Sequence, residues 1–479
     1  MTRKRTGLGI DVGTSALKAL AVDEAGAVLA TSERSYPLLT PQPGWSEQEP
    51  EAWWQAAREA LAELTARLEG EYEPMALGLS GQMHGMVPLD EAGEVVRPAL
   101  LWNDQRTGDA VDAIEQAVPR REMIERTGNP AITGFQLAKV VWLREVEPES
   151  YARTRHVLFP KDFIGFRLTG ELFAEPSDAS GSNAFNLHAK AWDADVLKAL
   201  ELDPRLWPQV VPSKAVAGDI EARVAKELGL PEGLNVVAGA GDNAAAAYGM
   251  GLSSERPELG SLSLGTSGAV FAPQAGTVTD PAGRVHLFCH ADGGYFLLGV
   301  TLAAAGSLNW FREKLAPGHS FSQLLELAAE VSPGAGGVTF KPYLAGERTP
   351  HLDPQLRGSF HGLSLASGLP ELVRAVLEGV AFSLRDALEV MKPLGAPERA
   401  LLTGGGGRSD VWTKILADVL QIPLGLGGQV TGAAYGAARL ALETGGESPP
   451  RPESDVNWLE PGDFDPYAAA YDRYRELGP

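Results

Sequence analysis

One acidic side chain lies within a run of small apolar residues, in the segment Gly239–Asn243. Its neighbours from Leu234 to Leu252 are mostly Val, Ala and Gly, so little nearby could solvate a carboxylate at Asp242. A carboxylate in such surroundings needs a partner or a chemical task. Two interpretations follow. Asp242 is either the N-cap of a helix over Ala244–Tyr248, or a group that takes part in a reaction.

Two other segments have the residue types of loops that bind phosphate. They are Gly9–Ser15, with the sequence Gly-Ile-Asp-Val-Gly-Thr-Ser, and Ser263–Gly268, with the sequence Ser-Leu-Gly-Thr-Ser-Gly. Glycine lets the backbone approach an anion, Thr14 and Ser15 add hydroxyl donors, and Asp11 could hold Mg²⁺. Either segment alone could be an ordinary turn. Together with an apolar-flanked aspartate, the two segments indicate a phosphotransferase.

A third glycine-rich segment, Gly404–Gly407, follows an apolar stretch at 400–403 and precedes a helical pattern at 409–420. An order of strand, glycine loop and helix suits a nucleotide, because glycines admit a flat base or a phosphate close to the backbone. No Gly-Lys-Ser/Thr follows, so it is not a Walker A loop. The alternative is a flexible turn with Ser409 as the helix N-cap.

Polar side chains cluster in two segments of the first half, Gln82–Gly85 and Trp102–Arg106. Amides, carboxylates and imidazoles bind hydroxyl groups, and an aromatic ring or a methionine packs against carbon. This chemistry suits a polyol, although the same residues are also common in ordinary loops.

Composition narrows the classes of partner. The chain has 479 residues and a net charge of −21, with a single cysteine, Cys289. An acidic protein lacks the basic surface that nucleic acids and anionic membranes need, so we expect neither as a partner. One cysteine provides no disulfide framework, which together with the lack of a signal peptide predicts a cytoplasmic location. The oligomeric state stays open, with a homodimer among the options.

The pattern of elements repeats along the chain. Residues 6–31 predict three antiparallel strands, followed by a helix over about 50–69 and a strand at 75–80. After residue 260 a similar order returns, with strands within 260–300, a helix at 303–314 and a strand at 400–403. The chain is therefore expected to contain one α/β architecture twice, in domains 1–247 and 248–479.

At these residues the chain resembles the FGGY family of carbohydrate kinases, and most closely its xylulokinase members. The resemblance runs from about residue 7 to residue 445. It rests on motifs spread through both halves: Gly9–Ser15, Gln82–Gly85, Trp102–Asp104, Pro160–Asp162, Ser177–Gly181, Gly241–Asn243, Ser263–Gly268, Gly346–His351, Gly358–Glu378 and Gly405–Ser409.

The resemblance implies two actin-like, ribonuclease-H-like α/β domains with a central cleft. It implies an enzyme that uses ATP and Mg²⁺ to phosphorylate D-xylulose or a related ketose, with Asp242 as the general base. It also assigns roles to the matching residues: sugar contacts at Met83, His84, Asp104 and Asn243; ATP contacts at Thr14, Ser15, Gly265, Thr266, Gly406 and Asp410; and a Mg²⁺-linked carboxylate at Asp11.

Two alternatives remain at this stage. One is an FGGY kinase for another polyol or ketose, such as ribulose, gluconate or glycerol. The other is a non-catalytic, ATP-regulated binding protein on the actin scaffold, because a fold does not by itself define a function. Asp242 and the polar cluster at 102–106 favour an enzyme over a binding protein.

Overall fold

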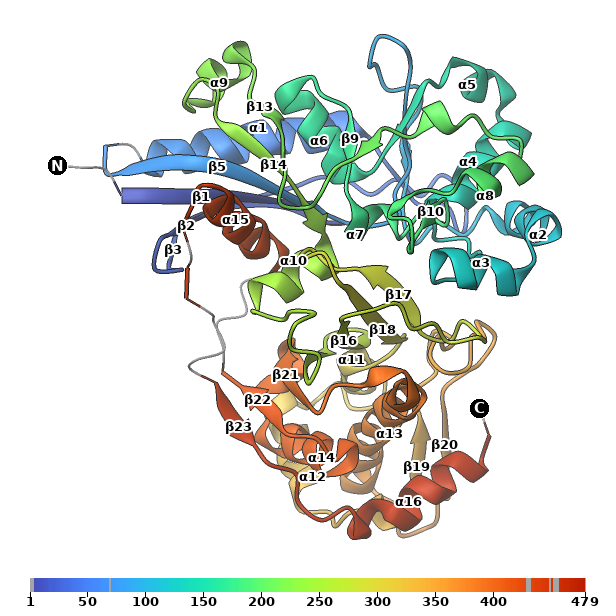
Figure 1. The fold of residues 1–479 in the computed structure, drawn as a ribbon. Coiled ribbons are helices and arrows are strands. Elements are labelled where there is room, and N and C mark those ends of the chain that lie inside the picture. Colours follow the sequence, from blue (N-terminus) through green and yellow to red (C-terminus); the bar gives the residue numbers. More distant parts are fainter. Residues whose placement is uncertain (1–3, 69, 428–431, 448, 451–455, 479) are drawn as a thin grey trace. The chain divides into compact units, whose positions relative to one another are not determined.

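The computed structural model describes residues 4–68, 70–427, 432–447, 449–450 and 456–478. The chain forms two compact units, and each is built from more than one segment (Figure 1). The first unit comprises Met1–Ser254, Phe288–Tyr295 and Gln429–Pro452. The second comprises Glu255–Leu287, Phe296–Gly428 and Glu453–Pro479.

A six-stranded sheet forms the centre of the first unit. Its strand order is β13–β14–β5–β1–β2–β3. The neighbours β1/β5 and β5/β14 are parallel, whereas β1/β2, β2/β3 and β13/β14 are antiparallel. The bounds are β1 (Lys4–Val12), β2 (Ala16–Asp23), β3 (Val28–Ser35), β5 (Tyr72–Gly81), β13 (Val216–Asp219) and β14 (Asn235–Gly241).

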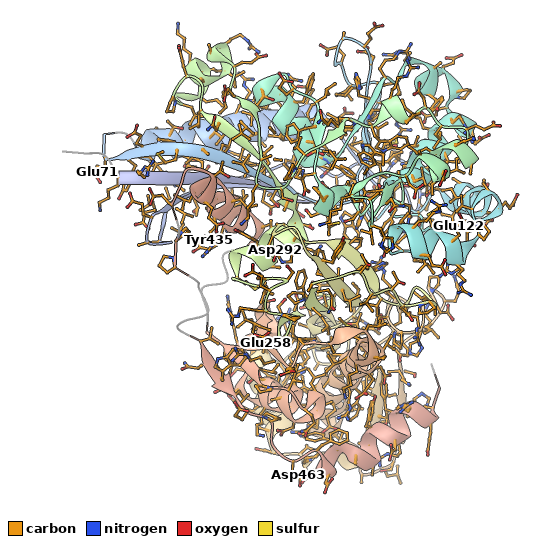
Figure 2. The ribbon with its side chains drawn as sticks, viewed as in Figure 1. Glu71, Glu122, Glu258, Asp292, Tyr435 and Asp463 are labelled. Carbon is orange, nitrogen blue, oxygen red and sulfur yellow. The ribbon has the colours of Figure 1, made fainter. Side chains whose placement is uncertain are left out.

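Helices cover both faces of this sheet, which explains why the central strands are almost continuously buried. On one face lie α1 (Pro50–Leu68) and α6 (Pro160–Thr169), and on the other lies α15 (Gly432–Thr444) (Figure 1). The helix α10 (Asp242–Gly249) packs on α15. Tyr435 on α15, labelled in Figure 2, donates a hydrogen bond of 2.9 Å to the carbonyl of Gly26, between β2 and β3.

Glycines allow α15 to approach its neighbours at backbone distance. A Cβ at Gly9 would collide with the carbonyl oxygen of Ala434 on α15, and a Cβ at Gly436 would collide with that of Ala245 on α10. Any larger residue would push these elements apart.

The first unit also has a second core, which includes Met86, Leu137 and Trp142. The remaining elements of the unit, of which some pack on the first core and some on the second, are β4 (Glu47–Gln48), β6 (Val87–Leu89), β7 (Ala99–Leu100), α2 (Gly108–Ala117), α3 (Arg120–Thr127), α4 (Gln136–Val146), α5 (Pro148–Arg153), β8 (His156–Leu158), β9 (Phe173–Ala174), α7 (Pro176–Ala179), β10 (Phe185–Asn186), β11 (Ala191–Trp192), α8 (Ala194–Ala199), η1 (Pro204–Leu206), β12 (Gln209–Val210) and α9 (Ala222–Leu228).

The second sheet repeats the topology of the first. Its order is β17–β18–β16–β15–β21–β22–β23, with β15/β21 and β21/β22 parallel and β15/β16 and β22/β23 antiparallel. The parallel strands β15, β21 and β22 thus correspond to β1, β5 and β14 of the first sheet. The antiparallel neighbours β16 and β23 correspond to β2 and β13. The strands are β15 (Leu259–Leu264), β16 (Gly268–Gln274), β17 (His286–Cys289), β18 (Tyr295–Thr301), β21 (Arg399–Thr403), β22 (Leu424–Leu426) and β23 (Asn457–Leu459).

Helices of the second unit pack around the long helix α13. The remaining elements are α11 (Ala305–Lys314), α12 (Phe321–Ala329), η2 (Ala335–Gly337), β19 (Thr339–Lys341), β20 (Ser359–His361), α13 (Leu369–Gly395), η3 (Gly405–Arg408), α14 (Asp410–Leu420) and α16 (Asp465–Glu476). In the described part of the chain, no helix combines the length and apolar character that a membrane span requires.

The repeated α/β architecture predicted from the sequence is confirmed, and the predicted helix over about 50–69 is α1. The sequence did not predict that α15, from the C-terminal half, packs on the sheet of the first unit. The division between residues 247 and 248 stays a prediction, and so does the cleft between the two domains.

Candidate functional site

The predicted site residues of the first unit lie at one edge of its sheet. Because β1, β5 and β14 are parallel, their carboxyl ends meet there, and the register aligns Val12 with Gly81 and Gly81 with Gly241. Thr14 and Ser15 follow β1, Met83 and His84 follow β5, and Asp242 and Asn243 follow β14. The carboxyl ends of strands are where α/β proteins commonly bind their ligands.

Asp242 is the first residue of α10, and the preceding Gly241 occupies the N-cap position without a side-chain cap bond. The N-cap interpretation of Asp242 is therefore wrong. Its Oδ1 accepts hydrogen bonds from the Asn243 amide N–H (2.7 Å) and side-chain Nδ2 (2.9 Å). Burial raises the pKa of Asp242 to about 6, although the bonds from Asn243 oppose this shift.

Asp11 is the second carboxylate at this edge. Its Oδ1 is buried and has no hydrogen-bond partner among the residues that the structure describes. The pKa of Asp11 is raised to about 7, mainly by burial and also by the charge of Asp242, while Lys18 opposes the shift. Two desolvated carboxylates that repel each other would bind a cation favourably.

The described residues contain no cluster of three His, Cys, Asp or Glu side chains that could hold a metal ion. Mg²⁺ in nucleotide-binding proteins commonly takes only one or two carboxylates and completes its shell with water and phosphate oxygens. The donor set at Asp11 therefore fits Mg²⁺ bound together with a nucleotide.

The turn that carries Thr14 and Ser15 is held by side chains from three other segments. Thr14 Oγ1 accepts a hydrogen bond from Trp102 Nε1 (3.0 Å) and donates one to Gln82 Oε1 (3.1 Å). The carbonyl of Thr14 accepts a bond from Gln48 Nε2 at 2.7 Å. Ser15 is exposed on the same turn. This bonding fixes the backbone of the first predicted phosphate loop.

Met83 and His84 follow β5, and Met83 lies next to Asn243, the neighbour of the predicted base. Met83 is buried, and its sulfur lies 3.9 Å from Asn243 Nδ2. His84 has a positive φ of 69°, stacks on Phe135 at 4.4 Å, and hydrogen-bonds through Nδ1 to the Gly181 carbonyl at 2.7 Å. A histidine held in this strained conformation has a fixed orientation at the strand edge.

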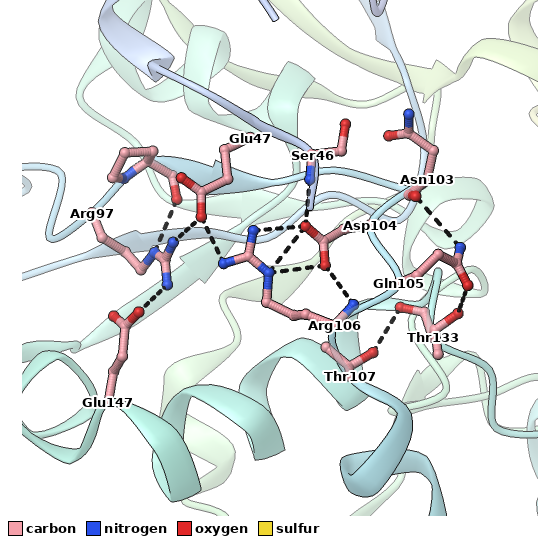
Figure 3. A network of polar contacts seen from close by, with 11 residues as sticks. Ser46, Glu47, Arg97, Asn103, Asp104, Gln105, Arg106, Thr107, Thr133 and Glu147 are labelled. Atoms are coloured by element: carbon pink, nitrogen blue, oxygen red, sulfur yellow. Dashed lines mark hydrogen bonds and ion pairs between the residues drawn. The ribbon is translucent and has the colours of Figure 1, made fainter. Parts of the chain in front are cut away.

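Asp104 lies in a buried ionic network (Figure 3). Its carboxylate accepts hydrogen bonds from the amides of Ser46 (2.7 Å) and Arg106 (3.0 Å), and from the Arg106 guanidinium. Arg106 also pairs with Glu47 at 2.6 Å. A sugar contact by Asp104 stays a prediction, but these bonds already occupy both oxygens. They hold the loop whose Trp102 is 41% exposed.

The second unit has a cavity of about 590 Å³ at the matching edge of its own sheet, where β15 and β21 end. Gly265 and Thr266 line it from the loop after β15, and Gly406 lines it from the glycine segment after β21. The carbonyls of Gly265 and Thr266 accept hydrogen bonds from backbone amides at the start of α11 (2.7–3.2 Å). Asp410, at the start of α14, is not among the lining residues.

Large apolar side chains complete the cavity, and sequence reasoning did not identify them. They are Trp310 on α11, Phe321 and Leu325 on α12, and Trp412 on α14. In the sequence these residues have the spacing of ordinary core residues on helices, so only the tertiary structure shows that they line a cavity. A cavity of this size with apolar walls and a glycine-rich rim suits a flat ligand such as a nucleotide base.

Family models match both halves of the chain. Residues 6–249 match the N-terminal domain of the FGGY family of carbohydrate kinases, and residues 260–443 match its C-terminal domain. The chain belongs to the FGGY family of carbohydrate kinases. The resemblance stated from the motifs is thus confirmed, as is the actin-like α/β fold class that it implied.

Individual FGGY relatives agree with this assignment. The xylulose kinase of Lactococcus lactis subsp. lactis is 40% identical over 86% of this chain and 82% of its own length. A crystal structure of a xyloylose kinase from Brucella ovis is 38% identical, with a TM-score of 0.92 over 99% of both chains. A gluconate kinase from Lactobacillus acidophilus is 26% identical, with a TM-score of 0.93 over 99% of this chain and 97% of that one. The protein is thus a carbohydrate kinase similar to the xylulose kinases.

Proposed function

We propose that this FGGY kinase transfers the γ-phosphoryl group of ATP to D-xylulose and releases D-xylulose 5-phosphate and ADP. The observation that carries the proposal is the strand edge of the first unit, where Asp242 and Asn243 meet Met83. A carboxylate beside an amide and an apolar thioether can accept a hydroxyl proton while it holds a sugar. The similarity to xylulose kinases supports D-xylulose as that sugar.

Asp242 acts as the general base in this proposal. Both bonds from Asn243 reach Oδ1, and among the described residues none reaches Oδ2. Oδ2 is thus available for the proton of the C5 hydroxyl. As that O–H bond breaks, the hydroxyl oxygen bonds to the γ-phosphorus and the bond from phosphorus to ADP breaks. With a pKa of about 6, Asp242 is mostly ionised at neutral pH and only moderately basic, as a general base should be.

The nucleotide binds in the second unit. Its base lies in the cavity walled by Trp310 and Trp412, and its phosphates lie against the loop of Gly265 and Thr266. The exposed Ser15 hydroxyl donates a hydrogen bond to the transferred phosphoryl group, and Thr14 contributes through its backbone, because its own hydroxyl proton is donated to Gln82. Asp11 would hold Mg²⁺, which would neutralise charge on the phosphate oxygens. Phosphoryl transfer depends mainly on such positioning and charge neutralisation.

The test is ADP release measured with D-xylulose, D-ribulose, D-gluconate, glycerol and no acceptor. We expect the highest kcat/KM with D-xylulose, and ³¹P–¹H correlation NMR should place the phosphate on C5. A higher kcat/KM with another acceptor would move the assignment to that sugar. Tight ATP binding with no acceptor phosphorylated would instead favour the non-catalytic binding protein.

A further inference from the structure

Four ionisable side chains are buried together in the first unit. Lys161, Asp162, Glu175 and Asp178 are each at most 1% exposed. Charged residues are almost never buried to this extent unless they are paired. Lys161 forms ion pairs with Asp162 and, at 3.6 Å, with Glu175. The cluster is therefore built around Lys161, and the proposed chemistry uses none of its members.

Glu175 accepts hydrogen bonds on both carboxylate oxygens. Oε1 accepts from the Ser177 hydroxyl (2.8 Å) and the Asp178 amide (2.8 Å). Oε2 accepts from the Ser177 amide (2.9 Å) and the Ser213 hydroxyl (2.7 Å). This single carboxylate thus fixes two serines that come from separate segments of the chain.

Both serines bind the end of β14, directly before Asp242. The Ser177 hydroxyl accepts a hydrogen bond of 3.0 Å from the amide of Gly241. The carbonyl of Ser213 accepts one of 3.0 Å from the amide of Gly239. The regular pairing of β14 with β5 is interrupted between Val237 and Ala240, and Gly239 has a φ of +77°. Within the interruption, the carbonyls of Ala215 and Ser213 bind the backbone amides of Ala238 and Gly239. The ladder resumes at Ala240, and Ser177 adds its hydrogen bond at Gly241, the last residue before Asp242.

We propose that Glu175, through Ser177 and Ser213, positions Asp242 for proton transfer; this inference rests on the general-base role proposed above. Ser177 orients Gly241, whose backbone conformation sets the direction of the next side chain. Lys161 balances the charge of Glu175. Although burial lowers it, the surrounding carboxylates raise the pKa of Lys161 overall, so the ammonium stays charged. Glu175 and Ser177 are positioning residues and do not contact the sugar.

The test compares Ser177→Ala with Ser182→Ala as a matched control. Ser182 is a fully buried serine nearby in the same segment, but among the described residues its hydroxyl bonds only to the carbonyl of Ala179 and the amide of Ala184. We expect Ser177→Ala to lower kcat by about 10- to 100-fold, as a base displaced by a fraction of an ångström would. The KM values for D-xylulose and ATP should change by less than about twofold, and Ser182→Ala should leave kcat within about twofold.

A double-mutant cycle separates this inference from the proposed function. In an Asp242→Asn background, Ser177→Ala should lower kcat no further, because the base that it positions is absent. An equal fall in both backgrounds would overturn the positioning role, as would a normal kcat in Ser177→Ala alone. If Asp242→Asn by itself keeps its kcat, the proposed function fails, and that single variant shows it.

A loss of folding would not leave the question open. If Ser177→Ala does not fold, Ser213→Ala is judged by the same criteria, because it removes the second arm of the same carboxylate. Ser177→Thr keeps the hydroxyl and should restore most of the kcat that Ser177→Ala loses. A Ser177→Thr enzyme as slow as Ser177→Ala would show that packing, and not the hydroxyl, sets the rate.

Discussion

Replacing Asp242 with Asn should abolish most activity and yet stabilise the protein. Asn keeps the shape of the side chain, and its Oδ1 can still accept both bonds from Asn243. It cannot accept the substrate proton, so kcat should fall by about 10²- to 10⁴-fold, the usual contribution of a positioned base. Sugar and ATP should still bind, because Asn keeps the shape of the side chain and Asp11 can still hold the cation that accompanies ATP.

The stability effect follows from the raised pKa. The pKa of Asp242 rises from 3.8 to about 6 on folding, so the protonated side chain stabilises the folded state. This stabilisation is complete below pH 3.8 and is lost as the pH rises through about 6. At neutral pH the ionised carboxylate thus destabilises the fold. The shift corresponds to about 3 kcal/mol, which partial exposure reduces to about 1–2 kcal/mol. Asp242→Asn should therefore raise Tm at pH 7 and leave it unchanged near pH 3.

The assay measures kcat and Tm of both enzymes across pH. The kcat of the unmodified enzyme should fall about tenfold between pH 7 and pH 5, because protonated Asp242 cannot act as a base. Asp109→Asn is the matched control, since Asp109 is an exposed aspartate in the first turn of α2. Its kcat should not change. A normal kcat together with a lower Tm in Asp242→Asn would refute the reasoning and make Asp242 a structural residue.

Three further substitutions test the site and its support. Trp310→Ala should raise the KM for ATP about 3- to 10-fold and leave the KM for D-xylulose unchanged, because the ring walls the cavity of the second unit; an altered sugar KM alone would contradict the nucleotide assignment. Asp104→Asn should lower the free energy of unfolding by about 3–5 kcal/mol, measured by thermal unfolding, because the buried Arg106 guanidinium loses a charged partner. An unchanged Tm with a raised KM for the sugar would instead support a direct sugar contact. Gly436→Ala should lower the free energy of unfolding by about 1–3 kcal/mol and also lower kcat, because the new Cβ collides with the backbone of α10. The control Gly276→Ala should change neither quantity, because a Cβ there meets nothing within 4 Å.

Motifs indicated candidate site residues but not the neighbours that hold them in place. Asp242 could be identified because a carboxylate in an apolar run is conspicuous in a sequence. Asp104 was predicted to contact sugar because a polar residue in a loop looks the same whether it binds a ligand or a neighbour. Only the structure shows that Ser46 and Arg106 occupy its oxygens. Trp310 gave no signal, because a tryptophan on an amphipathic helix usually belongs to a core.

The contact between α10 and α15 could not be predicted for a different reason. Gly436 and Ala245 are far apart in sequence, and nothing in either segment identifies its partner. Glycines in a helix weaken it and suggest a close approach, but they do not say to what. The support of Asp242 depends on contacts of this kind, which is why the sequence indicated the residue and not how it is held.

Both units place their predicted ligand loops at the same position in the same topology. In the first, Gly13-Thr14-Ser15 follows β1, and the segment with Met83 follows its parallel neighbour β5. In the second, Gly265-Thr266-Ser267 follows β15, and Gly404–Gly407 follows its parallel neighbour β21. The same three residues thus recur at the carboxyl end of the same strand. That edge offers backbone amides and short hydroxyl side chains to an anion in both cases. The units differ at the strand on the other side of β5. This strand, β14, is followed directly by Asp242, whereas its counterpart β22 is followed by Gly427. The repeat therefore accounts for two predicted phosphate loops but only one candidate base, which is why we propose that the proton acceptor and the sugar site belong to the first unit.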